Sequence, residues 1–101
     1  MLKYHMAYTI YATGENYTDK TLEEINILRT SFRNELIKNG ARYTVDTTFY
    51  ITSELNIANM INFILNIFNQ LRPAWLVPYC NIDFDIFEGD MKSRSIIKLK
   101  E

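Results

Sequence analysis

Residues 53–71, SELNIANMINFILNIFNQL, are the stretch around which the rest of the chain is organised. At about 100° per residue, its asparagines fall on one narrow face of a helix, and apolar side chains cover more than half of the remaining circumference. These asparagines are Asn59, Asn62, Asn66 and Asn69. A helix that exposes one face to water usually carries Lys and Glu there, but residues 55–71 contain no charged side chain. The pattern predicts an amphipathic helix whose polar face consists of amides.

Two interpretations of this helix remain open. It is either a well-buried helix with a thin solvated edge, or a helix covered on one side by its own sheet and on the other by a partner protein. The stretch is too short to span a membrane, and its amides would be unpaired in lipid. Ser53 is the expected N-cap, and the helix should end at Arg72-Pro73, because the residue before a proline avoids helical geometry.

The chain before this helix predicts a strand and a second helix. Residues 4–12 alternate apolar and polar side chains, as a half-buried strand does. Thr21 and Glu24 have the spacing of a capping box, so we expect the next helix to begin there. Its apolar stripe runs through Leu22, Ile25, Leu28, Phe32 and Leu36. The pair Asn39-Gly40 is expected to stop it.

Residues 42–52 are extended, with Tyr43, Val45, Phe49 and Ile51 on one side. They form either one long strand or two short strands joined near Asp46-Thr47. No glycine marks that turn, so both interpretations stay open.

The chain after the central helix predicts a connector and a hairpin. Trp75 lies in the apolar connector 74–78 and is expected to plug the end of the core. Residues 79–88 form a strand, Gly89-Asp90 a tight turn, and residues 93–100 the returning strand. This turn would set Ile82 opposite Ile97, Cys80 opposite Leu99 and Asp85 opposite Arg94.

The order strand, helix, one or two strands, helix, strand, strand predicts an α+β fold. We expect a ferredoxin-like two-layer sandwich with an antiparallel sheet and both helices on one face. The whole chain, 1–101, is expected to form a single domain.

Composition limits the classes of function. Hydrophobic residues make up 48% of the 101 residues and charged residues 23%, with a net charge of −1. The chain is therefore globular and is not built for non-specific nucleic-acid binding, although a local basic patch could still bind RNA. Its one cysteine, Cys80, cannot form an internal disulfide and should be buried. A cytoplasmic location is expected, without a signal peptide, and Met6 is an alternative start.

Two groups of polar residues could carry chemistry. The carboxylates Asp83, Asp85, Glu88 and Asp90 could hold a hard cation, but pairing with basic residues of the neighbouring strand is favoured. The sequence predicts no metal site and no cofactor. The open face of the sheet should show Tyr11, Tyr50 and other aromatic residues, which could stack on unpaired bases or pack against a second copy of the sheet. Arg29, Arg33 and Arg42 are the nearest basic groups.

Three short motifs resemble the GhoS-type antitoxin family of type V toxin–antitoxin systems. Residues 49–55, FYITSEL, are similar to the family's Phe-x-Ile-Thr-x-x-Leu stretch before the second helix. Residues 81–85, NIDFD, resemble its Asp-Ile-Asp-Phe-Asp strand, and residues 28–30, LRT, resemble its Leu-Arg-Ser. The resemblance covers about two-thirds of the chain and extends to the order of elements. The same fold group includes the second CRISPR-associated protein and virulence-associated protein D.

The resemblance implies an endoribonuclease that cuts the messenger RNA of a membrane-active toxin. By resemblance, Arg29 is the catalytic arginine. Under this hypothesis Arg33 or Arg42 assists it, and Arg42, Tyr11 and Tyr50 bind single-stranded RNA. The related metal-dependent proteins carry an Asp at the end of the first strand, where this chain has Ala12 or Thr13.

The alternative hypothesis is a non-catalytic protein-binding module that acts through the asparagine helix or the open sheet face. Under this hypothesis Asn59, Asn62, Asn66 and Asn69 contact a protein partner. A homodimer is expected under both hypotheses.

Overall fold

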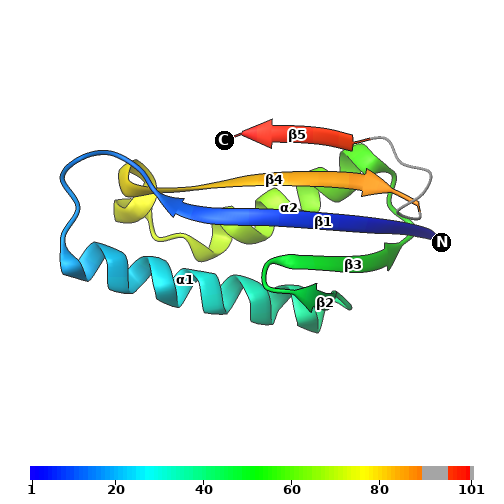
Figure 1. The fold of residues 1–101 in the computed structure, drawn as a ribbon, viewed down its shortest axis with the longest axis horizontal. Coiled ribbons are helices and arrows are strands. Elements are labelled where there is room, and N and C mark those ends of the chain that lie inside the picture. Colours follow the sequence, from blue (N-terminus) through cyan, green and yellow to red (C-terminus); the bar gives the residue numbers. More distant parts are fainter. Residues whose placement is uncertain (90–95, 101) are drawn as a thin grey trace.

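The computed structural model describes residues 1–89 and 96–100. In chain order, its elements are β1 (Leu2–Ala12), α1 (Asp19–Lys38), β2 (Arg42–Val45), β3 (Thr48–Ser53), α2 (Ile57–Leu71), the 3-10 helix η1 (Ala74–Tyr79), β4 (Cys80–Glu88) and β5 (Ile96–Lys100). The strands form one antiparallel sheet in the order β2-β3-β1-β4-β5 (Figure 1). The first four strands with their two helices make the expected ferredoxin-like α+β sandwich, and β5 lies outside β4.

The hydrophobic core lies between one face of the sheet and the two helices. Alternate residues of each central strand point into it, as the period of a half-buried strand requires. On β1 and β4 the buried residues are Tyr4, Met6, Tyr8, Ile10, Cys80, Ile82, Phe84 and Ile86. The helices contribute Ile25, Leu28, Phe32 and Leu36 from α1 and Met60, Ile64, Ile67 and Phe68 from α2. Cys80 is buried, as expected, and the other face of the sheet is left open.

Helix α1 begins earlier than the sequence predicted. Its N-cap is Thr18, whose hydroxyl accepts the backbone N–H of Thr21, while the Thr21 hydroxyl accepts that of Thr18. The predicted capping box of Thr21 and Glu24 is therefore wrong. Thr21 occupies the third helical position and is buried. The predicted stop is confirmed, because Asn39 is the C-cap and Gly40 follows with a φ of 98°.

Residues 42–53 form two short strands, which decides the question left open by the sequence. The turn at Asp46-Thr47 uses a φ of 47° at Asp46, a conformation that Asp adopts more easily than most residues. A β-bulge between Tyr43 and Val45 breaks the alternation of side chains. Val45 is consequently 67% exposed, although the sequence pattern placed it on the same side as Phe49.

Helix α2 begins later than predicted, and Ser53 is not its cap. Ser53 is the last residue of β3 and lies opposite Leu2 in β1. The cap is Asn56, whose side-chain oxygen accepts the backbone N–H of Asn59. The helix ends at Leu71, just before Arg72-Pro73, as expected. No helix among the described residues has the length and apolar character needed to cross a membrane.

Trp75 does not plug the core. It is 45% exposed on η1, and the neighbouring Leu76 is fully buried in its place. Tyr79 of the same short helix also packs against the core, so Leu76 and Tyr79 take the place that the sequence pattern assigned to the larger Trp75.

The C-terminal hairpin has a different register from the predicted one. Ile97 lies opposite Ile86, Leu99 opposite Phe84 and Lys98 opposite Asp85. The predicted turn at Gly89-Asp90 and residues 93–95 of the predicted returning strand extend beyond the described residues. Asp90 of the acidic group and Arg94, the predicted partner of Asp85, also lie outside the described residues.

Candidate functional site

The short β2–β3 hairpin leaves part of β1 without a strand neighbour. Strand β4 pairs with β1 as far as Ala12, but β3 pairs with it only as far as Ala7. Figure 1 shows the hairpin turn beside the middle of β1. One more bond, from the Tyr8 N–H to the Thr47 carbonyl oxygen at 3.2 Å, closes the paired region. Beyond it, the edge of β1 faces the side chains of α1.

Arg29 reaches from α1 to this open edge. Its Nε and Nη2 both donate to the Ile10 carbonyl oxygen, at 3.0 and 2.7 Å. Its Nη1 donates to the Asn26 side-chain oxygen at 2.8 Å. These bonds use three of the five N–H groups of the guanidinium. The group is thus fixed in place, and two N–H donors remain for a ligand.

Arg33 lies one helical turn further along α1. Its Nη1 donates to the backbone oxygen of Asp46 at 3.1 Å, and its guanidinium carbon lies 4.2 Å from the centre of the Tyr43 ring. Neither arginine forms an ion pair within the described residues, since the ion pair found there joins Lys38 to Glu35. The direct partners of both guanidinium groups are neutral carbonyls, an amide and a ring, so these contacts do not neutralise their positive charges.

The two arginines share a hollow of about 370 Å³. Its wall combines β1, α1 and the β2–β3 turn, and the lining residues are Tyr8, Thr9, Ile10, Arg29, Thr30, Arg33, Asp46 and Thr47. Two guanidinium groups, three threonines and one carboxylate are a lining suited to a polar anion. We call this site the arginine hollow.

The tyrosines beneath the arginine hollow are structural. The hydroxyls of Tyr8 and Tyr43 are 2.8 Å apart. Burial raises the pKa of both phenols, and their mutual hydrogen bond raises that of Tyr43 further. Both stay protonated at neutral pH, so neither is a base for catalysis there. Among the described residues that line the hollow, Asp46 is the one with a carboxylate.

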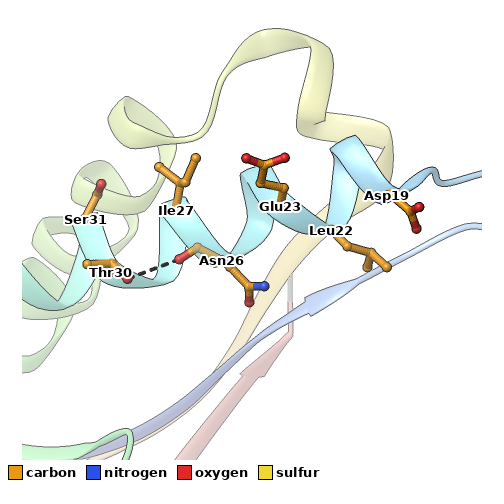
Figure 2. A pocket seen from close by; sticks show the side chains of 7 residues that line it. All are labelled: Asp19, Leu22, Glu23, Asn26, Ile27, Thr30 and Ser31. Atoms are coloured by element: carbon orange, nitrogen blue, oxygen red, sulfur yellow. Dashed lines mark hydrogen bonds between the residues drawn. The ribbon is translucent and has the colours of Figure 1, made fainter.

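A second hollow lies on the outer face of α1. Its seven lining residues all come from this one helix, and their side chains project from its surface (Figure 2). They are Asp19, Leu22, Glu23, Asn26, Ile27, Thr30 and Ser31. The lining has two carboxylates and no cation, so it is poorly suited to an anionic ligand.

The structure separates the other predicted RNA-binding residues. Arg42 lies opposite Tyr50, so these two share one end of the open sheet face. Tyr11 lies opposite Asn81 at the other end, and its hydroxyl donates to Asp83 at 3.4 Å. His5 and Tyr11 are six positions apart on β1, or about 20 Å at the rise of a strand. Tyr11 and Tyr50 therefore do not form one binding surface.

The asparagine stripe is exposed along its whole length, as the sequence predicted. Asn59, Asn62, Asn66 and Asn69 all have high solvent exposure on α2. Asn69 also accepts a hydrogen bond from Arg72 at 3.1 Å.

Other reactive groups are distant from the arginine hollow or unsuited to catalysis. Burial raises the pKa of the Cys80 thiol, which disfavours its nucleophilic form. The His5 Nδ1 lies 2.9 Å from the Gly89 carbonyl oxygen, on the open face. In the part of the chain that the structure describes, no group of three or more His, Cys, Asp or Glu side chains could hold a metal ion.

Sequence reasoning singled out both arginines but missed Asp46 and the threonines around them. Asp46 could have been found from the interpretation of residues 42–52 as two short strands. A turn at Asp46-Thr47 is what brings Asp46 near Arg33, and no glycine marks that turn. Comparison with family models, curated proteins and solved structures found no match to this chain.

Proposed function

We propose that this protein is a GhoS-like antitoxin that binds single-stranded RNA and cleaves the message of its toxin. The observation that carries the proposal is the arginine hollow, where two guanidinium groups are held by backbone oxygens and keep their charge. Planar guanidinium groups bind phosphate oxygens through paired hydrogen bonds. The resemblance of residues 28–30 and 49–55 to the GhoS family supports the same assignment for Arg29.

In this proposal, Arg29 and Arg33 hold the scissile phosphate and stabilise the charge that develops on it. Asp46 accepts the proton of the ribose 2′-hydroxyl, because it is the carboxylate that lines the hollow. The 2′-oxygen then bonds to phosphorus, and the bond from phosphorus to the 5′-oxygen breaks. The departing 5′-oxygen takes a proton from water. The products are a 2′,3′-cyclic phosphate and a 5′-hydroxyl.

The test compares cleavage of labelled single-stranded RNA by the wild-type protein and by Arg29→Ala, Arg33→Ala and Asp46→Asn. The proposal predicts cleavage that survives EDTA. Each arginine variant should lose tenfold or more, and Asp46→Asn should bind RNA but cleave it poorly. Lys38→Ala is the matched control, since it removes an exposed cation from the same helix. Full activity in Arg29→Ala would refute the assignment.

A second candidate function rests on the exposed asparagine stripe of α2. We propose as the alternative a non-catalytic dimeric module that contacts a protein through this face. The double variant Asn62→Lys/Asn66→Lys should abolish dimer or partner binding in sedimentation experiments, whereas Lys38→Ala, a change on the other helix, should leave that binding intact. A wild-type protein that stays monomeric at high concentration and captures no protein would contradict this alternative.

A further inference from the structure

We propose that His5, Tyr50 and Phe87 form a platform that stacks unpaired bases of the bound RNA; this inference rests on the proposed function. The three rings lie on the open face of the sheet, opposite the helices. In the register, His5 of β1 lies directly opposite Tyr50 of β3 and opposite Phe87 of β4. They therefore span three adjacent strands. We call them the ring platform.

The rings of the platform are held by contacts with one another and with the backbone. The rings of His5 and Phe87 are stacked, with centroids 5.2 Å apart and an angle of 9° between their planes. The Tyr50 ring is tilted by 42° to His5 at 6.0 Å. The contact of the His5 Nδ1 with the Gly89 oxygen fixes the central ring. All three side chains are only half-buried, so part of each ring faces solvent.

Sheets of this kind are used for RNA recognition in other proteins, where aromatic side chains on neighbouring central strands stack on successive bases. Stacking accepts any base, because every base has a flat aromatic face. The ring platform thus offers base contacts that the arginine hollow, suited to phosphate, lacks.

The charges around the ring platform favour RNA over a second copy of the sheet. The Lys3 ammonium lies 4.5 Å from the centre of the Tyr50 ring, and Arg42 is the strand neighbour of Tyr50. These cations complement the phosphates of a nucleic acid. In a two-fold dimer of this face, each of these cations would instead need an acidic partner on the other copy. On the other side of the platform, Asp85 lies opposite Lys98 in the register.

The ring platform and the arginine hollow lie along the same strand. His5 belongs to the platform, and Thr9, four residues later on β1, lines the hollow. The separation is about 13 Å at the rise of a strand. In this proposal one short RNA runs along β1, with a phosphate in the hollow and bases on the rings.

The test measures binding of a short 2′-O-methyl RNA, which cannot be cleaved, and of an abasic oligomer of the same length. The RNA should bind more tightly than the abasic oligomer, by about fivefold or more for each stacked base. Tyr50→Leu keeps an apolar side chain and removes the ring. This variant should bind the 2′-O-methyl RNA more weakly and the abasic oligomer unchanged. It should also abolish the fluorescence quenching of a 2-aminopurine base placed in that RNA. Tyr17→Leu, a matched change at an exposed loop tyrosine, should alter neither.

The outcomes separate this inference from the proposed function. If the wild type binds both oligomers equally and Arg29→Ala binds neither, the ring platform is overturned, but phosphate binding in the arginine hollow is supported. Failure of the wild-type protein to bind either oligomer would overturn both. A Tyr50→Leu change that converts a dimer to a monomer with unchanged RNA binding would assign the rings to a second copy of the chain.

Discussion

At the scale of single residues, Arg29 has a structural role beside the proposed chemical one. Its guanidinium supplies the donors that a neighbouring strand would otherwise give to the Ile10 carbonyl oxygen. An exposed strand edge invites pairing with other chains, and a charged side chain over it prevents this. A loss of activity in Arg29→Ala must therefore be read together with its stability.

We expect Arg29→Ala to lower the free energy of unfolding by about 1 kcal/mol, because the Ile10 oxygen loses a charged donor but can still reach water. Urea denaturation of the wild type and the variant measures this. Lys38→Ala, with an exposed ion pair, should change stability by less than about 0.5 kcal/mol. If Arg29→Ala were as stable as Lys38→Ala, the hydrogen bonds from Arg29 to Ile10 would make no net contribution to the free energy of unfolding.

The buried tyrosine pair makes stability depend on alkaline pH. The pKa of Tyr43 and Tyr8 is raised in the folded protein above the ordinary value of about 10. A raised pKa means that the folded state holds the proton more tightly, so this stabilisation is complete below about pH 10 and is lost as the pH rises further. Tyr43→Phe should show a smaller loss of stability between about pH 9 and 11. An identical pH dependence in both proteins would contradict the burial of this pair.

At the scale of elements, both helix starts show how the sequence misleads. Each offers two capping residues three positions apart, Thr18 and Thr21 for α1 and Ser53 and Asn56 for α2. The choice depends on tertiary contacts: Thr21 is buried in the core, and Ser53 is held in the sheet opposite Leu2. Local patterns predicted both helices correctly, but the first residue of each helix was set by packing.

Asn56→Ala should destabilise the protein by about 1 kcal/mol, because the first turn of α2 loses its side-chain acceptor. Asn59→Ala is the matched control: it also removes an asparagine, but from the exposed helical face, where alanine is the better helix former. Thermal unfolding of the two variants compares them. Equal destabilisation by both would mean that the cap at Asn56 is unimportant.

At the scale of the whole molecule, alternation identified the sheet faces but could not fix the pairing of its last two strands. The observed register differs from the predicted one by four residues, as Ile97 lies opposite Ile86 instead of Ile82. An even shift keeps every side chain on the same face, so hydrophobic pattern does not distinguish the two. Charge pattern does not distinguish them either, since Asp85 lies opposite a basic residue in both registers.

The candidate site was predictable only in part, because it depends on strand lengths and sheet order, which are properties of the whole fold. Arg29 and Arg33 could be chosen from their type and from the family resemblance. The arginine hollow itself exists because β3 is shorter than β1, and that depends on a turn at Asp46 with no glycine to mark it. The ring platform likewise requires the sheet order, which brings His5 between Tyr50 and Phe87.

The most direct test of the account is cleavage of labelled single-stranded RNA in EDTA by the wild type, Arg29→Ala and Lys38→Ala under matched conditions. If the arginine hollow is the cleavage site, the wild type and Lys38→Ala should cut the RNA and leave 2′,3′-cyclic phosphate ends. Arg29→Ala, still folded by circular dichroism, should be at least tenfold slower. Cutting by Arg29→Ala at the wild-type rate, or no cutting by any of the three, would contradict it.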